Sequence, residues 1–281
     1  MSLAGLQRSV MTVRSVAIIG AGTIGRAILR GLVRSGTGLR LIATARSEAS
    51  LEEARRAGAE ASRDNAWAVR EADLVILTVK PRSVADVLRE ASAGLEGKAL
   101  VSLAAAVPSS FIASLAPKAK VMRGMTNVNV EVGHGFTTLS AGPGADAEAR
   151  AMAEEVFGRL GVVEWVDEEY LDALTALSGS APAFIAEIVD ALALGGIAAG
   201  LPRELAYRAV LHAMLGTARS LLEKGWSPHQ LRDMVLTPAG TTIRGVMVLQ
   251  GNGLKRTLME AVLEATRRAR EIREELASGK L

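Results

Sequence analysis

The sequence contains no cysteine among its 281 residues, which excludes disulfides, thiolate metal sites and a cysteine nucleophile. The three histidines, His134, His212 and His229, are not spaced as metal ligands, so no metal site is expected. Aromatic residues make up only 3% of the chain, and the net charge of +3 is a small excess of 33 basic over 30 acidic residues. Because no basic stripe interleaved with aromatics is present, we expect no nucleic-acid partner.

Long charge-free runs are also scarce. Residues 1–14 lack an apolar stretch before a small-residue cleavage site, so no secretory signal is expected. The longest uncharged stretch is Ala99–Pro117, and Pro108, Ser109 and Ser110 interrupt it. It is better interpreted as a strand, a turn and a short helix than as a membrane span. We expect a soluble cytoplasmic protein without a membrane partner.

The first half of the chain has a clear alternation of apolar runs and helical patterns. Six runs predict strands: Val16–Ile19, Leu39–Ala43, Leu74–Val79, Ala99–Leu103, Val121–Met122 and Val162–Val166. Helical patterns lie between most of them, at residues 24–34, 48–57, 65–71, 83–92, 109–115 and 146–160. This alternation predicts an α/β fold with a Rossmann-type, doubly wound, mostly parallel sheet over residues 1–166. On such sheets, ligands bind outside the carboxyl ends of the strands.

Residues 167–281 predict an all-helical domain for substrate binding and dimerisation. The charges of Asp167–Glu169 are interpreted either as charges at a helix start or as solvated charges. Tyr170–Gly196 is apolar nearly all round, and a second helix over Arg203–Lys224 is closed by Gly225. A helix that is apolar on every side must be covered on every side, which a helical domain of about 110 residues can hardly do alone. We expect self-association through this domain; the alternative is that the first domain covers one face.

A glycine-rich turn occupies the residues Gly20, Ala21, Gly22, Thr23, Ile24 and Gly25. It follows an apolar run and precedes a helical pattern, the context in which Gly-x-Gly-x-x-Gly is typical of a dinucleotide cradle. Gly20 would permit the sharp turn, Gly22 the approach of a pyrophosphate, and Gly25 the close packing of helix on strand. The positive end of the helix would face the phosphates. The alternative is an ordinary strand-to-helix turn without a ligand.

No acidic residue follows the second predicted strand, where an acid would bind the ribose 2′-hydroxyl of NAD. Arg46 stands there instead, flanked by Thr44 and Ser47. A guanidinium can bind a 2′-phosphate that a carboxylate would repel, and one such contact contributes about 1.5–3 kcal/mol. We expect NADP(H) as the cofactor, with NAD(H) bound more weakly. The alternative is that Arg46 is a solvated surface charge.

Two further loops follow predicted strands. The residues Val79, Lys80 and Pro81 are expected near the ribose or phosphates of the cofactor. The small residues Ala104–Ala106 would leave room for the nicotinamide. Either loop could also be an ordinary connection.

The second half contains two interrupted helical patterns. In Thr175–Pro182, a glycine and a proline break the helix and present the hydroxyls of Ser178 and Ser180. In Leu236–Ile243, a turn leads into a helix N-terminus, which can hold a carboxylate without an arginine. The candidate substrate residues of this turn are Thr237, Gly240, Thr241 and Thr242. The alternative for each segment is an ordinary break between helices, in which the hydroxyls only cap the helix ends.

Together these features resemble the pyrroline-5-carboxylate reductase family over nearly the whole chain. The resemblance is carried by Ala17–Gly25, Val79–Pro81, Thr175–Pro182, Arg232–Met234 and Thr237–Ile243. It implies reduction of the cyclic imine Δ1-pyrroline-5-carboxylate to L-proline with NAD(P)H, the last step of proline biosynthesis. It also implies a Rossmann domain joined to a helical domain that interlocks in dimers, often within larger rings.

The resemblance further implies roles for single residues. The turn Thr237–Thr242 would hold the substrate carboxylate through backbone N–H groups, and the Thr242 hydroxyl would reach the ring nitrogen. Ser178 and Ser180 would lie beside the nicotinamide and the substrate. Asn65 would contact the adenosine side of the cofactor.

The chain departs from the family at residues 125–129, which are Met-Thr-Asn-Val-Asn where Met-Pro-Asn-Thr-Pro is usual. Asn127 stays in register in this cofactor-facing loop. Three alternatives stay open: a reductase of a related imine, a β-hydroxyacid-type dehydrogenase, and a non-catalytic NADP-binding protein. The dehydrogenase would want a helical lysine near the substrate, and residues 175–182 contain none.

Overall fold

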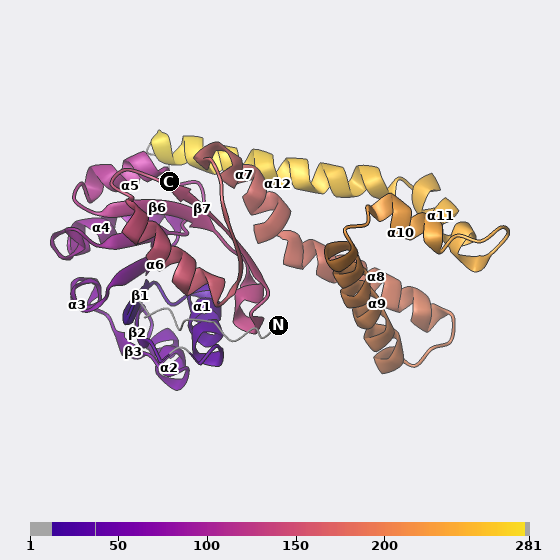
Figure 1. Ribbon diagram of the computed structural model, residues 1–281, viewed down its shortest axis with the longest axis horizontal. Helices are drawn as coiled ribbons and strands as arrows, with labels where there is room; N and C mark the ends of the chain where they lie inside the picture. The colour runs from indigo at the N-terminus through magenta and orange to yellow at the C-terminus, as the bar shows by residue number, and fades with distance from the viewer. Residues whose placement is uncertain (1–12, 37, 279–281) are drawn as a thin grey trace, which may run out of the picture. The chain divides into compact units, whose positions relative to one another are not determined.

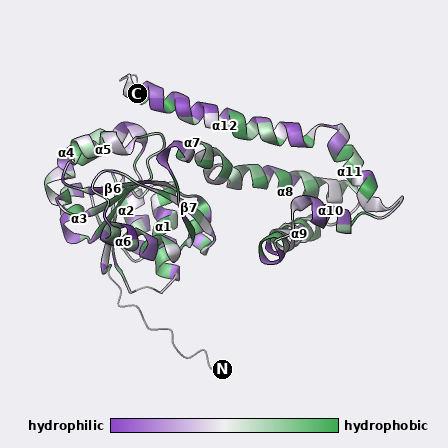
Figure 2. Cartoon of the chain, turned by 45° about the horizontal axis from the view of Figure 1, so that its top comes forward, coloured by the Kyte–Doolittle hydropathy of each residue, from purple (hydrophilic) through white to green (hydrophobic). Residues whose placement is uncertain are grey.

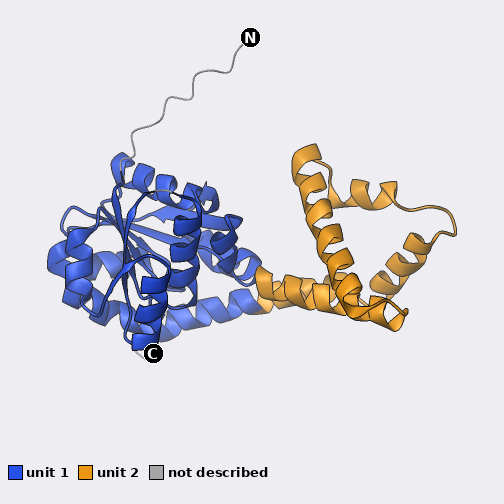
Figure 3. Cartoon of the chain, turned by 90° about the horizontal axis from the view of Figure 1, so that it is seen from below, with its two compact units in different colours: residues 1–180, 265–281 blue, residues 181–264 orange. Residues whose placement is uncertain are grey.

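The computed structural model describes residues 13–36 and 38–278, which form two compact units (Figure 3). Unit 1 contains the described residues up to Ser180 and those from Ala265 onward, and unit 2 is Ala181–Glu264. The predicted domain boundary between residues 166 and 167 lies before the first residue of unit 2, Ala181, and it stays a prediction. Residues 167–180 and the chain end belong to unit 1: ion pairs described below bind the first segment to the sheet and the second segment to the first.

Unit 1 is built on an eight-stranded sheet with the order β3-β2-β1-β4-β5-β6-β7-β8 (Figure 1). Its strands are β1 (Ser15–Ile19), β2 (Arg40–Thr44), β3 (Glu60–Ser62), β4 (Leu74–Leu77), β5 (Ala99–Ser102), β6 (Lys120–Met125), β7 (Gly135–Ala141) and β8 (Gly161–Trp165). All neighbouring strands pair in parallel except β6 and β7. The predicted doubly wound, mostly parallel sheet is confirmed.

Two of these strands were not predicted from the sequence. β7 carries buried hydroxyls, among them Thr137 and Thr138, instead of an apolar run. β3 is a three-residue edge strand. Neither has the hydrophobic pattern by which a strand is recognised.

Helices cover both faces of the sheet. They are α1 (Thr23–Arg34), α2 (Glu48–Arg56), α3 (Asn65–Glu71), α4 (Val84–Ala91), α5 (Ser109–Leu115) and α6 (Ala147–Gly158). Successive residues of β1 point to opposite faces, so Val16 and Ile18 join one core with Phe157 of α6. Ala17 and Ile19 join the other core, which also contains buried residues of α3, α4 and α5. Burial on both faces explains why these strands are apolar without alternation.

The later elements are helical. They are α7 (Leu171–Leu174), the π-helical turn η5 (Thr175–Gly179), α8 (Ala181–Ala198), α9 (Arg203–Lys224), α10 (Pro228–Met234), α11 (Thr241–Gly251) and α12 (Leu254–Ala277). The predicted α9 is confirmed, and Gly225 ends it in a left-handed conformation at φ 64°. Within a single chain, unit 2 buries few of its residues. No residue of α10 or α11 is buried, and Ala193 is the one buried residue of α8. Figure 2 colours α8 mostly in the green of hydrophobic residues, and Ile185, Leu192 and Leu194 of this helix are exposed.

Candidate active site

The glycine turn between β1 and α1 is tightly packed at two of its three positions. Gly20 has a φ of +98°, and a Cβ there would lie 2.6 Å from Cγ1 of Val79. A Cβ on Gly25 would lie 2.6 Å from the carbonyl oxygen of Gly20. A Cβ on Gly22 would meet no heavy atom closer than 3.9 Å. Gly20 and Gly25 are thus required by the fold, and Gly22 faces open space.

The N-terminus of α1 offers unpaired N–H groups at this open space. Gly22 is the N-cap residue, no side chain caps the helix, and its first turn contains no acidic residue. The helix has 12 residues, enough for its dipole to favour an anion. The turn therefore fits the pyrophosphate of a dinucleotide, with Gly22 as the point of closest approach.

Thr44 and Asn65 brace the glycine turn from β2 and α3. The Thr44 hydroxyl lies 3.3 Å from the backbone nitrogen of Gly20 and donates to Oδ1 of Asn65 at 2.7 Å. The Asn65 amide in turn donates to Glu90 at 2.8 Å. Both side chains have partners within the protein, and their predicted contacts with the cofactor stay predictions.

Arg46 is exposed just after β2, and no carboxylate pairs with it in the part of the chain that the structure describes. Ser47 caps α2 by accepting a hydrogen bond from the backbone nitrogen of Ser50 at 3.2 Å. Arg26 is already engaged, because its Nε lies 2.8 Å from Glu53. Arg46 is therefore the guanidinium free to bind a phosphate at the end of β2.

Two more loops open at the same edge of the sheet, since β1, β4 and β5 are parallel neighbours. After β4, Val79 packs on Gly20, and the exposed Lys80 precedes the 3₁₀ turn that starts at Pro81. After β5, the buried Ala106 has a φ of 64°, a strained conformation for a residue with a side chain.

Asn127 and Ser178 are distant in sequence and adjacent in unit 1. The Asn127 amide donates to the carbonyl oxygen of Ser178 at 3.2 Å and to its hydroxyl at 3.3 Å. The predicted helix interruption is confirmed as the π-helical turn η5, in which the Ser180 nitrogen donates to the Thr175 carbonyl at 2.9 Å. The loop at 125–129, which departs from the usual family sequence, therefore places Asn127 in contact with Ser178.

A buried charge cluster beside this pair was missed from the sequence. Nη1 of Arg123 lies 3.2 Å from Glu168, and Nη2 lies 3.3 Å from Asp172. Asp172 also pairs with Arg273 of α12 at 2.7 Å. Of the two interpretations of Glu168, the helix start is confirmed, because it begins the 3₁₀ turn η4 (Glu168–Tyr170), and the solvated charge is wrong, because it also accepts hydrogen bonds from the backbone and hydroxyl of Ser109. An arginine inside an otherwise apolar strand was the available signal, since a buried charge needs a partner.

Burial and hydrogen bonding act on the Glu168 carboxyl in opposite directions. Burial favours its neutral form, while hydrogen bonds from Ser109 and the charge of Arg123 favour the carboxylate. The second group of effects is larger, so the pKa of Glu168 lies below its ordinary value.

In unit 2, the turn Thr237–Gly240 leads into α11. The Gly240 nitrogen donates to the Thr237 carbonyl at 3.0 Å, and a Cβ on Gly240 would collide with the Thr237 hydroxyl. Ala239 adopts a φ of 57°. No side chain caps α11 and its first turn contains no acidic residue, so the N–H groups at Thr241 and Thr242 suit a carboxylate.

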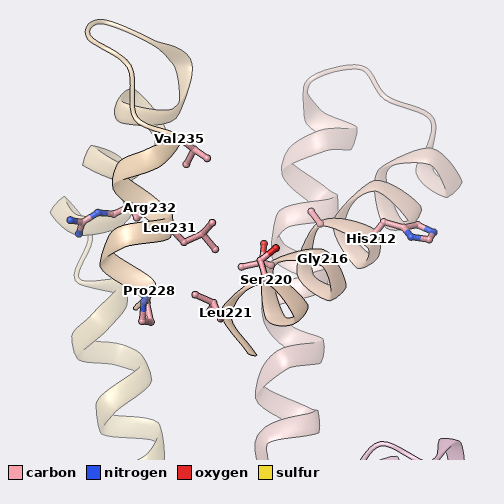
Figure 4. A pocket seen from close by; sticks show the side chains of 10 residues that line it. His212, Gly216, Ser220, Leu221, Pro228, Leu231, Arg232 and Val235 are labelled. Atoms are coloured by element: carbon pink, nitrogen blue, oxygen red, sulfur yellow. The ribbon is translucent and has the colours of Figure 1, made fainter. Parts of the chain in front are cut away.

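Unit 2 also has a hollow between α9 and α10, which Figure 4 shows in close-up. Its wall includes His212, Gly216, Ser220, Leu231 and Arg232. None of the four candidate substrate residues lines it, so this hollow is separate from the turn that precedes α11.

These features together define a class of protein. They are a mostly parallel sheet, a glycine turn, an uncapped helix N-terminus and an unpaired guanidinium after the second strand. The class is that of Rossmann-type dinucleotide-binding oxidoreductases, here joined to a helical unit.

Comparison with known proteins identifies the family within that class. A family model described as pyrroline-5-carboxylate reductase dimerisation matches residues 168–272, and one described as NADP oxidoreductase coenzyme F420-dependent matches residues 15–106. The chain is 36% identical over 264 residues to the pyrroline-5-carboxylate reductase of Methanosarcina acetivorans, which covers 92% of this chain and 98% of that protein. The chain belongs to the pyrroline-5-carboxylate reductase family.

Solved structures agree. The structure of a pyrroline-5-carboxylate reductase from Coxiella burnetii is 32% identical, has a TM-score of 0.82, and covers 92% of this chain and 98% of its own. That of the Plasmodium falciparum pyrroline carboxylate reductase with NADP bound has a TM-score of 0.85 at 22% identity, covering 94% of this chain and 100% of its own. The second likeness concerns the fold alone.

Proposed function

We propose that this protein reduces Δ1-pyrroline-5-carboxylate to L-proline with NADPH. The observation that carries the proposal is the match to pyrroline-5-carboxylate reductases over 92% of the chain. The glycine turn and the Asn127–Ser178 contact give that match a physical basis. Family membership also weighs against a β-hydroxyacid-type dehydrogenase.

The residues of unit 1 fit the cofactor. The N–H groups of Thr23 and Ile24 at the start of α1 would bind the pyrophosphate, and Arg46 would bind the 2′-phosphate. Bound NADPH supplies a hydride. Ser178 and Asn127 would lie at the nicotinamide and hold it in orientation toward the imine carbon.

The turn before α11 would bind the substrate. Its free N–H groups would hold the carboxylate, and the hydroxyl of Thr242 would donate a hydrogen bond at the ring nitrogen. A protonated imine is already electrophilic, so orientation and this hydrogen bond are the tasks left to the protein.

A direct assay tests the proposal. The purified chain with NADPH and pyrroline-5-carboxylate should lose NADPH absorbance and form an equal amount of proline. Thr242→Val should lower kcat about 100-fold and leave NADPH affinity unchanged. Thr241→Val is the matched control, because it makes the same substitution at the neighbouring position and also keeps the backbone N–H. No turnover by the unaltered protein over a broad pH range would refute the proposed function.

We propose that the chain self-associates through its helical unit and acts in the cytoplasm. By length and composition alone, Glu168–Ala198 could cross a membrane. One such helix is weak evidence of a membrane protein, because the core helix of a soluble protein passes the same test. This segment lies within the region matched by the dimerisation model, and it begins with the charges of Glu168 and Asp172. A second copy of the chain is therefore the better cover for its apolar side chains. Light scattering on the purified protein should give a dimer or a larger oligomer.

A further inference from the structure

The charge cluster at Arg123 is balanced, and its two central members are buried. Arg123 has 2% of its side chain exposed and Asp172 has 3%. Two arginines face two carboxylates, because Arg273 supplies the second positive charge. Such a set, left with one partner missing, would contain an uncompensated buried charge. The cluster therefore holds its members in one arrangement.

Arg123 can bridge two carboxylates because of their spacing. Glu168 and Asp172 are four residues apart in consecutive helical turns, and residues at this spacing share one face. The guanidinium reaches one carboxylate with each terminal nitrogen. A lysine, a single point charge, cannot reproduce this fork.

The same two segments meet again a short distance along the chain. β6 ends at Met125, and two residues later Asn127 donates to Ser178. On the helical side, Ser178 follows Asp172 by six residues. The charge contact at Asp172 thus precedes the π-helical turn η5, and the Asn127 amide contacts Ser178 within it.

The π-helical turn decides where Ser178 faces. Its i to i+5 hydrogen bond, from the Ser180 nitrogen to the Thr175 carbonyl, inserts one extra residue into the helix. The side chains after the insertion are rotated relative to an uninterrupted α-helix. Any slip of this turn would move the Ser178 hydroxyl away from Asn127.

We propose that Arg123 is a positioning residue: by binding Glu168 and Asp172 together, it holds η5 in the register that presents Ser178 to Asn127. The inference rests on the proposed function for its kinetic consequence, because Ser178 is placed there beside the nicotinamide. Arg273 completes the cluster by pairing with the remaining oxygen of Asp172. The structural part concerns the chain alone.

Amide hydrogen exchange tests the structural part without any turnover. Arg123→Lys should raise exchange rates at residues 174–180 at least about tenfold, and leave those of the sheet cores unchanged. Arg40→Lys is the matched control, since Arg40 also bridges two carboxylates, Glu60 and Glu71, in unit 1. Protection of 174–180 equal in both variants would overturn the proposal.

A double-mutant cycle tests the kinetic part. Arg123→Lys should lower kcat about tenfold with the dissociation constant for NADPH unchanged, and it should lower kcat less than about twofold in a Ser178→Ala background. Equal losses in both backgrounds would overturn positioning through Ser178. Should Arg123→Lys not fold, Glu168→Gln removes one arm of the fork, and the same pattern is expected. If the unaltered protein shows no turnover, the proposed function fails, and hydrogen exchange still decides the structural part.

Discussion

The two compact units differ in how they bury their apolar side chains. Unit 1 has two cores, one on each face of the sheet, and both contain large side chains that are fully buried, such as Phe157 and Leu88. Unit 2 leaves large apolar residues exposed, such as Leu222 at 84%. Unit 1 thus buries its apolar side chains by its own contacts, whereas unit 2 leaves an apolar surface of the kind that marks an interaction site.

The largest expected effect is in the core of unit 1. Phe157 is fully buried in the core that covers one face of the sheet. Phe157→Ala should lower the free energy of unfolding of unit 1 by about 3–5 kcal/mol, because a cavity remains. Urea denaturation followed by circular dichroism measures it. Leu222→Ala, on the uncovered surface of unit 2, should leave the unfolding of unit 1 unchanged; a comparable loss there would remove the contrast between the units.

The next effect concerns self-association. Met259 and Leu263 of α12 are 64% and 65% exposed in the single chain. Changing both to lysine should weaken association at least about 100-fold, since each buried apolar side chain contributes about 1.5–3 kcal/mol. Light scattering at a series of concentrations measures the change. Val162→Lys, which alters an exposed apolar residue of unit 1, should leave the mass unchanged.

A smaller effect is expected at the cofactor phosphate. Arg46→Asp should weaken NADPH binding about 10- to 100-fold, which corresponds to about 1.5–3 kcal/mol, and leave NADH binding nearly unchanged. Calorimetry measures both affinities. Arg56→Asp, a change of the same charge on α2, is the control. Equal losses of affinity for NADPH and NADH would show that Arg46 does not bind the 2′-phosphate.

The smallest expected effect is a pH dependence of unit 1. The folded state lowers the pKa of Glu168 below 4.5, so the unfolded chain binds the proton more tightly. The stabilisation is present above pH 4.5 and is lost as the pH falls through the lower folded pKa. Urea midpoints measured down this range should fall less in Glu168→Gln than in the unaltered protein. Identical slopes would contradict the assigned role of Arg123 and Ser109.

Much of unit 1 could be predicted because its strands are apolar on both faces and its turns are marked by glycine. β7 could not, because its buried threonines pair with groups elsewhere in the chain: the hydroxyl of Thr137 lies 2.8 Å from that of Thr126, and the hydroxyl of Thr138 donates to the carbonyl oxygen of Met125. Polar residues that find partners only after folding have no sequence pattern. The contacts that bind residues 167–180 to unit 1 have no sequence pattern for the same reason, since Glu168 and Asp172 meet Arg123 only in the folded chain.

The sequence by itself determined the glycine turn, the absence of an acid after the second strand, the interrupted helix at 175–182 and the helices that follow it. These are local features, set by backbone freedom, side-chain charge and periodicity. Only the tertiary structure decided that Arg123 lies on Glu168 and Asp172, that Asn127 meets Ser178, and that Arg273 returns to unit 1. Each of these contacts joins segments more than 40 residues apart in the sequence, and long-range pairing depends on the whole fold.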